Sequence, residues 1–209
     1  MFLTIAHNAA YTAIIKKSRF IGQVFRVNSE EAAQQIIEEV RSANRKANHH
    51  CFAYLIGDQD NIQRESDNGE PSGTAGVPIL RSLQMMKVHN VLAIVTRYFG
   101  GIKLGAGGLI RAYSNTTTNA LEAAGLVQRI KQATIIITVP YAQHDAVAYY
   151  LQEHQIALAH EDYGVAVQMT CYVDSEAYDQ LTSDLTNRFA NQLKFKKGAP
   201  RFHEVPYSK

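Results

Sequence analysis

The sequence predicts an α+β protein composed of two domains, residues 1–132 and 133–209. Segments with helical periodicity alternate with short apolar segments typical of strands along all 209 residues. The charge changes sign close to the proposed boundary, because residues 1–133 carry 15 Lys and Arg against 10 Asp and Glu, whereas residues 134–209 carry 6 against 9. A chain of this length forms one large or two small domains, and the asymmetry favours two.

In the first domain, strands are expected to alternate with helices. The predicted strands are residues 11–16, 19–27, 51–56, 91–98 and 126–131, and the predicted helices are residues 28–45, 78–89 and 104–124. The first two strands are rich in β-branched and aromatic residues. Asn28 and Ser29, followed by two glutamates, are typical of a helix start. Pro78 suits the first turn of the second helix, and Gly125 is a typical stop for the third. The continuous apolar segment 91–98 predicts a strand buried on both faces.

The second domain is expected to follow a shorter cycle of elements. Its predicted strands are residues 133–139, 155–160, 164–173 and 193 onward, and its predicted helices are residues 142–154 and 174–189. Asp174 or Ser175 is a suitable cap for the second helix. The resulting order βαββαβ is that of the ferredoxin-like unit.

A long polar segment, residues 57–76, separates the third predicted strand from the second predicted helix. It is rich in turn-forming residues, so we expect an exposed loop. Because a loop of this length in a compact domain is either functional or disordered, it is predicted to be the most mobile long segment of the first domain.

Glycines concentrate in the same domain, where eight of the 13 lie between residues 69 and 108. Glycine is costly to order, so this density requires either turns with positive φ or close approach of the backbone by a ligand or partner. Arg97, Lys103 and Arg111 lie in this part of the chain without any acid among them. A strand, a glycine pair and a helix N-terminus in succession present free N–H groups and cations to an anion.

The candidate binding residues are Asp67, Glu70, Ser72, Thr74, Arg97, Tyr98, Gly100, Gly101, Lys103, Gly105, Gly107, Gly108 and Arg111. The three cations are expected to line one concavity that faces residues 67–76. The nucleotide fingerprints are absent, because Gly105 is followed by Ala106 and because Ile110 stands where the dinucleotide pattern requires a small residue. No cofactor is therefore predicted. The alternative, that the glycines permit tight packing between helix and strand, stays open.

The acids of the 57–76 segment have several interpretations. Asp67 and Glu70 have the chemistry of a general acid–base pair or of hard-metal ligands, but turn formation explains them equally well. Ser72 lacks a nucleophile elbow, because Glu70 occupies the first glycine position of that motif. Cys51 lies in an apolar strand and is expected in the core. No catalytic or metal-binding residue is predicted.

The composition also bears on the cellular location. No apolar run approaches the 18 residues of a membrane-spanning helix, and the first residues lack a signal-peptide pattern. The two cysteines are far apart and not in a paired motif. A cytoplasmic location without a membrane partner is therefore expected.

Four blocks of sequence, in order, resemble the signature of the Impact family in its bacterial YigZ branch. They are KKSRFI at residues 16–21, HHCFAY at 49–54, SDNGEPSGTAG at 66–76 and TRYFGGIKLGAGGLIRAYS at 96–114. The chain departs from the pattern at Asn68, where the family usually has a second acid. The resemblance implies a first domain similar to the second domain of ribosomal protein S-five. It also implies a second, ferredoxin-like domain similar to one in elongation factor G.

The resemblance implies a role in the regulation of translation, through contact with the ribosome, RNA or a translation factor. We therefore expect a non-enzymatic protein that binds an anionic partner at the glycine-rich loop. Two alternatives remain: a hydrolase acting on a peptide or phosphorylated substrate, and a protein-interaction module. Salt distinguishes the first expectation from the last, because binding to phosphates weakens steeply as salt rises.

Overall fold

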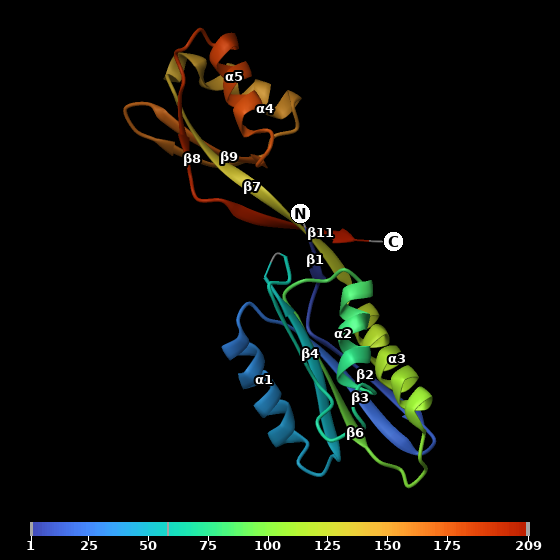
Figure 1. Ribbon diagram of the computed structural model, residues 1–209. Coiled ribbons are helices and arrows are strands. Elements are labelled where there is room, and N and C mark those ends of the chain that lie inside the picture. Colours follow the sequence, from blue (N-terminus) through green and yellow to red (C-terminus); the bar gives the residue numbers. More distant parts are fainter. Residues whose placement is uncertain (1, 58, 208–209) are drawn as a thin grey trace. The chain divides into compact units, whose positions relative to one another are not determined.

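The computed structural model describes residues 2–57 and 59–207, which form an α+β protein with two sheets and five α-helices (Figure 1). These residues divide into two compact units. The first contains the chain up to Gln128 and again from Val205, and the second is Arg129–Glu204. In the part of the chain that the structure describes, no helix is both long and apolar enough to cross a membrane.

The strands are β1 (Phe2–Ile5), β2 (Ala9–Ile15), β3 (Ser18–Arg26), β4 (His49–Ile56), β5 (Ile62–Ser66), β6 (Val91–Tyr98), β7 (Leu126–Val139), β8 (Leu158–Tyr163), β9 (Val167–Asp174), β10 (Lys194–Lys197) and β11 (Arg201–Tyr207). The helices are α1 (Glu30–Ala43), α2 (Gly76–Met85), α3 (Ala106–Ala124), α4 (His144–Glu153) and α5 (Tyr178–Arg188), with a short 3₁₀ turn at Tyr141–Gln143.

The first unit is built on a five-stranded sheet of order β2-β3-β6-β4-β5, in which neighbouring strands are antiparallel. Helices α2 and α3 cover one face and α1 covers the other (Figure 1). The central strand β6 serves both cores, since side chains alternate between the faces of a strand. Val91 and Val95 belong to the core under α2 and α3, whereas Leu92 and Ile94 belong to the core under α1. The predicted strand, buried on both faces, is confirmed.

Local sequence explains the start of α1. The Ser29 hydroxyl accepts a hydrogen bond from the Ala32 amide at 3.2 Å, and the first turn carries Glu30 and Glu31. Ala33 and Ile37 then face the sheet at helical spacing and are almost fully buried. The capping residue and the apolar period therefore specify this helix together.

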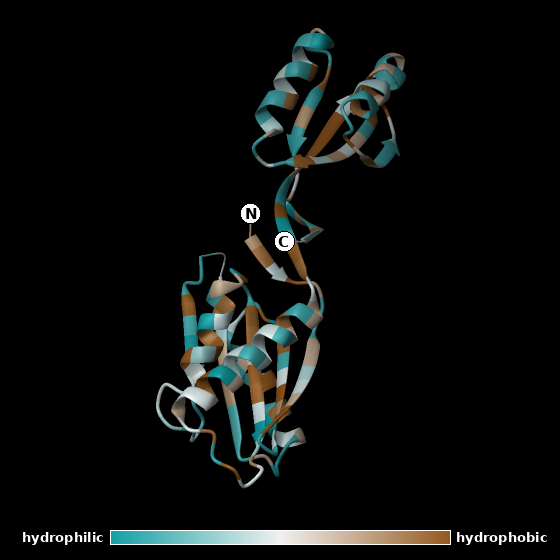
Figure 2. Cartoon of the chain, turned by 90° about the vertical axis from the view of Figure 1, so that its right-hand side faces the viewer, coloured by the Kyte–Doolittle hydropathy of each residue, from teal (hydrophilic) through white to brown (hydrophobic). Residues whose placement is uncertain are grey.

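The second unit contains the strands β10-β7-β9-β8, paired antiparallel in that order, with α4 and α5 packed against them, and most of β11, which also pairs with β7. Ile135 and Ile137 of β7 point into the core, together with Met169 and Cys171 of β9. Burial raises the pKa of the Cys171 thiol to about 11. Figure 2 shows hydrophobic residues on the strands beneath the helices of each unit. The element order strand, helix, strand, strand, helix, strand agrees with the prediction as far as β10, and β11 follows as an additional strand.

Two strand predictions are wrong. Residues 126–131 and 133–139 form one continuous strand, β7, which runs through the exposed Lys131 and the half-buried Gln132. The proposed domain boundary falls inside this strand. The 57–76 segment is not an open loop throughout, because β5 pairs with β4 over residues 62–66. It is an edge strand with polar side chains, which resembles a loop in sequence.

Candidate functional site

A cavity of about 450 Å³ opens in the first unit where β4 and the glycine-rich loop meet the start of α3. We call it the glycine-loop cavity. Its lining residues are Asn48, His49, Gly69, Glu70, Pro71, Arg97, Phe99, Lys103, Leu104, Gly105, Ala106 and Leu109. The volume lies in the range of small-ligand sites. The fold thus brings together parts of the 57–76 segment and of the glycine-rich loop, as the motif analysis anticipated.

A buried carboxylate organises the floor of the cavity. Glu70 Oε1 accepts hydrogen bonds from Arg97 Nη1 at 2.5 Å and from the Tyr113 hydroxyl at 2.8 Å. The Glu70 and Arg97 side chains are only 3% and 5% exposed. Burial raises the pKa of Tyr113, so this hydroxyl keeps its proton and donates it. His49 completes the group, with Nε2 3.9 Å from Glu70 Oε1.

Arg97 does not occupy the exposed position that phosphate contact would require. Its guanidinium lies between two aromatic rings, 5.2 Å from the centroid of Phe20 and 5.4 Å from that of Phe99. The ion pair with the Glu70 carboxylate neutralises the positive charge of Arg97. Arg97 Nε is buried and, among the described residues, has no acceptor. The structure therefore changes the role of Arg97 from a surface cation to a buried structural cation that lines the cavity.

Asp67 organises the loop that forms one wall of the cavity. Its carboxylate accepts hydrogen bonds from the amides of Gly73, Ala75 and Gly76 at 2.7–2.9 Å. Partial burial alone would raise the pKa of Asp67, but these backbone hydrogen bonds outweigh it and hold the pKa below its ordinary value. Asp67 is thus engaged by its own loop, which removes the basis for a general base or metal ligand at this residue.

Replacing Asp67 with Asn should destabilise the first unit by roughly 1.5–3 kcal/mol at neutral pH, because the charge-assisted hydrogen bonds to the loop are removed. A lowered pKa contributes stability above the ordinary value of 3.8, and that contribution disappears as pH falls through the folded-state value. The difference in unfolding free energy between wild type and Asp67→Asn should therefore shrink in acid. Denaturation at several pH values measures it, and a pH-independent difference would contradict this role.

The start of α3 supplies the polar groups on the opposite wall. The first backbone hydrogen bond of the helix runs from the Leu109 amide to the Gly105 carbonyl. The amides of residues 106–108 therefore have no hydrogen-bond acceptor within the helix. No side chain caps this end, and the first turn contains no acid. Gly105 has φ of 73° and turns the chain into the helix. Lys103 lies exposed beside these amides, so the N-terminal end of α3 is open and positive.

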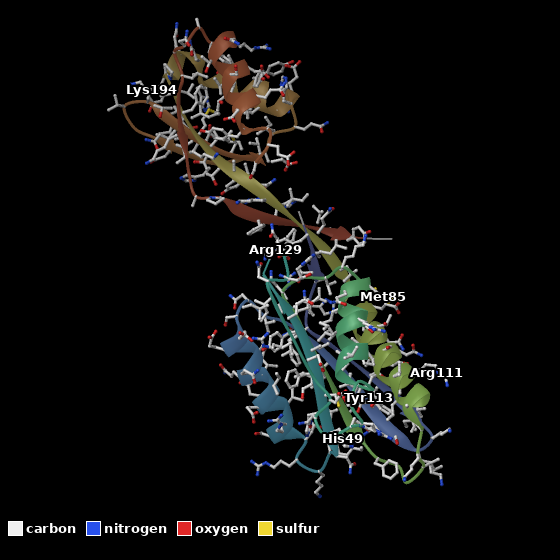
Figure 3. All side chains as sticks on the ribbon, viewed as in Figure 1. His49, Met85, Arg111, Tyr113, Arg129 and Lys194 are labelled. Atoms are coloured by element: carbon white, nitrogen blue, oxygen red, sulfur yellow. The ribbon has the colours of Figure 1, made fainter. Side chains whose placement is uncertain are left out.

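The remaining candidate residues have varied positions. Tyr98 donates a hydrogen bond to Asn44, and the buried Thr74 donates one to the Pro71 carbonyl, whereas Ser72 is exposed. Gly101 has a φ of 84°, and Gly100 packs against the backbone of Lys17. Neither Gly107 nor Gly108 lines the glycine-loop cavity. Gly100 thus has a packing role, but against a hairpin turn and not between helix and strand as the alternative held. Arg111 is exposed on α3 and lies outside this cavity (Figure 3). The prediction that Arg97, Lys103 and Arg111 line one concavity is therefore wrong.

Sequence inspection missed part of the site. His49 is not among the predicted site residues, yet it donates through Nδ1 to the Asn68 carbonyl at 3.0 Å and places Nε2 3.9 Å from Glu70 Oε1. Tyr113 has the appearance of an ordinary helix residue. Its spacing of four residues from Leu109 places it on the buried face of α3, and this periodicity was a usable signal.

Cys51 lies directly behind this group, and its thiol donates to the Asp67 carbonyl at 2.9 Å. Burial raises the pKa of the thiol to about 12, which makes it a poor nucleophile. Within residues 2–57 and 59–207, no group of three or more potential ligands could hold a metal ion. The expected position of Cys51 in the core is confirmed.

Fold and cavity together define a class: a two-unit α+β protein whose first unit carries a ligand-sized cavity at an uncapped helix start. Comparison with known proteins identifies the family. Residues 16–121 match the Impact N-terminal domain, and residues 137–192 match a domain of unknown function, DUF1949. This chain belongs to the Impact family, and the resemblance noted in its four sequence blocks is confirmed.

The relatives include bacterial proteins of similar length. The chain is 39% identical over 189 residues to the IMPACT family member YvyE of Bacillus subtilis, covering 89% of this chain and 87% of that protein. It is 36% identical over 151 residues to the IMPACT family member YigZ of Escherichia coli, covering 71% and 74%. A crystal structure described as that of a hypothetical protein has a TM-score of 0.59 and 30% identity, covering 93% and 95% of the two chains.

Proposed function

We propose that this protein is a non-enzymatic, translation-associated protein of the cytoplasm, which binds RNA, free or in the ribosome, at the glycine-loop cavity. The observation that supports it is the start of α3, where Ala106, whose amide lies outside the helix ladder, and Lys103 both line the cavity. Backbone N–H groups and a positive helix end are suited to phosphate. The link to translation rests on the family resemblance.

The second support for a binding role is the state of the reactive groups. Asp67 is engaged by its loop, Glu70 is paired with Arg97, and the Cys51 thiol has a raised pKa. None of these has the freedom of a nucleophile or a general base. A binding protein therefore accounts for the site better than a hydrolase.

We also infer the finer fold of each unit. The first unit would be of the type found in the second domain of ribosomal protein S-five, as the family resemblance implies. The second would be ferredoxin-like, because β7 lies between β9 and β10 and the strand order β10-β7-β9-β8 is that of this fold.

A protein partner is a second candidate. Phe99, Ile102 and Ile110 are 41–45% exposed on the glycine-rich loop and the first turns of α3. Such side chains are suited to an apolar protein surface. In that case binding would change little with salt, whereas phosphate binding would weaken steeply.

Replacing Lys103 with Gln tests the RNA proposal. For a single strand, removing one contact to a phosphate should flatten the slope of log affinity against log salt by roughly 0.7. The measurement is titration of wild type and variant with a labelled single-stranded RNA across a salt series. Lys87→Gln is the matched control, since Lys87 is an exposed lysine between α2 and the opposite end of β6. Equal slopes for wild type and Lys103→Gln would refute the assignment of RNA to this cavity.

A further inference from the structure

A second, smaller hollow of about 290 Å³ lies on the other side of the start of α3. We call it the hairpin hollow. Its lining residues are Ile15, Lys16, Leu104, Gly108, Arg111, Ala112 and Asn115. They include two cations and one amide and no acid, and neither cation has an ion-pair partner within the described chain. The hollow therefore carries positive charge that no acidic residue in its lining neutralises.

The two hollows are neighbours. Leu104 lines both of them, so its side chain forms a shared wall. Residues 105 and 106 face the glycine-loop cavity, whereas Gly108 faces the hairpin hollow. The first turn of α3 thus presents its free amides between two cation-bearing depressions, with Lys103 at one and Lys16 and Arg111 at the other.

The turn that carries Lys16 is conformationally costly. Ile15 pairs with Ser18, so Lys16 and Lys17 are the two central residues of a tight hairpin. Both have positive φ, 44° and 64°. Asn-Gly is the favoured sequence for such a turn, and side chains other than Gly, Asn and Asp rarely adopt this conformation. Strain of this kind is commonly found at functional sites, and here it places a cation at the hollow.

The glycine-loop cavity has features that a bare helix end lacks. Arg97 lines the cavity with a side chain that is only 5% exposed, and its buried Nε donor has no acceptor among the described residues. Phe99 lines the same cavity and is 45% exposed. An exposed aromatic ring beside cations is the usual platform for a nucleic-acid base.

From these observations we propose that the two hollows hold two phosphates of one single-stranded RNA segment, which crosses the start of α3 over Leu104 with a base against Phe99. This inference rests on the proposed function and specifies its ligand. One phosphate accepts from the Ala106 amide and Lys103, and the next site along the strand is formed by Lys16 and Arg111. A ligand with a single phosphate would occupy only the first.

A matched pair of substitutions separates this arrangement from a general effect of positive charge. Lys16→Asn and Lys17→Asn remove the same charge at adjacent positions of one turn, but only Lys16 lines the hollow. Asparagine tolerates positive φ better than lysine, so both variants should keep or raise the melting temperature. Arg111→Gln and Arg81→Gln form a second pair, since both are exposed helix residues and only Arg111 lines the hollow.

The probes are uridine monophosphate and oligouridylates of increasing length. Wild type should bind the oligomers more tightly than the monophosphate. Lys16→Asn and Arg111→Gln should each weaken oligomer binding roughly tenfold, as expected for one charge-assisted contact, and leave monophosphate binding unchanged. Lys17→Asn and Arg81→Gln should match wild type. Phe99→Leu should weaken binding of both probes.

The outcomes distinguish this inference from the proposed function. Failure of wild type to bind any oligouridylate, or no effect of Lys103→Gln, would overturn both. A clear effect of Lys103→Gln with no effect of Lys16→Asn would overturn the two-phosphate arrangement alone. Equal reductions in affinity for Lys16→Asn and Lys17→Asn would also overturn it, because diffuse charge would then explain the binding.

Discussion

Replacing Glu70 with Ala should lower the free energy of unfolding of the first unit by about 3–5 kcal/mol, since it leaves the buried Arg97 guanidinium without its counter-charge. The substitution also removes the acceptor of the Tyr113 hydroxyl, which has no solvent contact to replace it. Both the unpaired Arg97 charge and the unpaired Tyr113 hydroxyl would then lie buried at the position of the Glu70 side chain. Glu70→Gln should cost less, because its carbonyl oxygen still accepts from Tyr113, but the charge of Arg97 remains unbalanced.

Urea denaturation followed by tyrosine fluorescence or circular dichroism measures the effect. Glu39→Ala is the control, because Glu39 is exposed on α1 and, within the described chain, accepts only from Gln35 of the same helix. Its effect should stay within about 0.5 kcal/mol. If Glu70→Ala were no more destabilising than Glu39→Ala, the network of Glu70, Arg97 and Tyr113 would not hold the cavity floor.

Replacing Gly100 with Ala should destabilise the first unit by about 3 kcal/mol or more, at the upper end of the cost of overpacking. A Cβ atom there would lie 2.0 Å from the carbonyl carbon and oxygen of Lys17 and 2.5 Å from the Ser18 nitrogen. Backbone atoms cannot turn aside as a flexible side chain can, so the glycine-rich loop or the hairpin must shift. Because the hairpin carries Lys16, binding at the hairpin hollow should weaken together with stability.

Gly107→Ala is the matched control. A Cβ at Gly107 meets no atom within 4 Å, and alanine is favoured over glycine in a helix by up to about 1 kcal/mol. Thermal melts of both variants should therefore show a large decrease for Gly100→Ala and a neutral or positive shift for Gly107→Ala. Similar melting temperatures would mean that the packing of Gly100 on Lys17 is loose in solution.

The elements with a strong local signal could be predicted from the sequence. The apolar strand β6 and the capped helix α1 needed no tertiary information, and their limits agree with the prediction to within about two residues. The edge strand β5 could not be recognised, since its polar side chains have the composition of a loop and only its pairing with β4 makes it a strand. The same holds for β7, whose continuity depends on its partners.

The site was predictable in position but not in chemistry. The glycines and cations predicted a site at the loop beside the start of α3, where the structure has a cavity, because helix ends and turns have local signatures. The state of Arg97 depends on Glu70, which lies 27 residues away and meets it only in the folded chain. Likewise, Lys16 and Arg111 share a hollow because the hairpin of β2 and β3 packs beside α3. Pairings across such distances leave no pattern in a single sequence.

The two cysteines of this chain give a means to follow the opening of each unit separately. Cys51 is fully buried in the first unit and Cys171 in the second, and the raised pKa values of both thiols keep them protonated in the closed state. A thiol-directed reagent therefore reacts only after the surrounding core has opened. With single-cysteine variants, labelling rates report two opening free energies in one polypeptide. Under the RNA-binding proposal, adding RNA should slow labelling at Cys51, behind the cavity, by the stabilisation that binding would confer on that core.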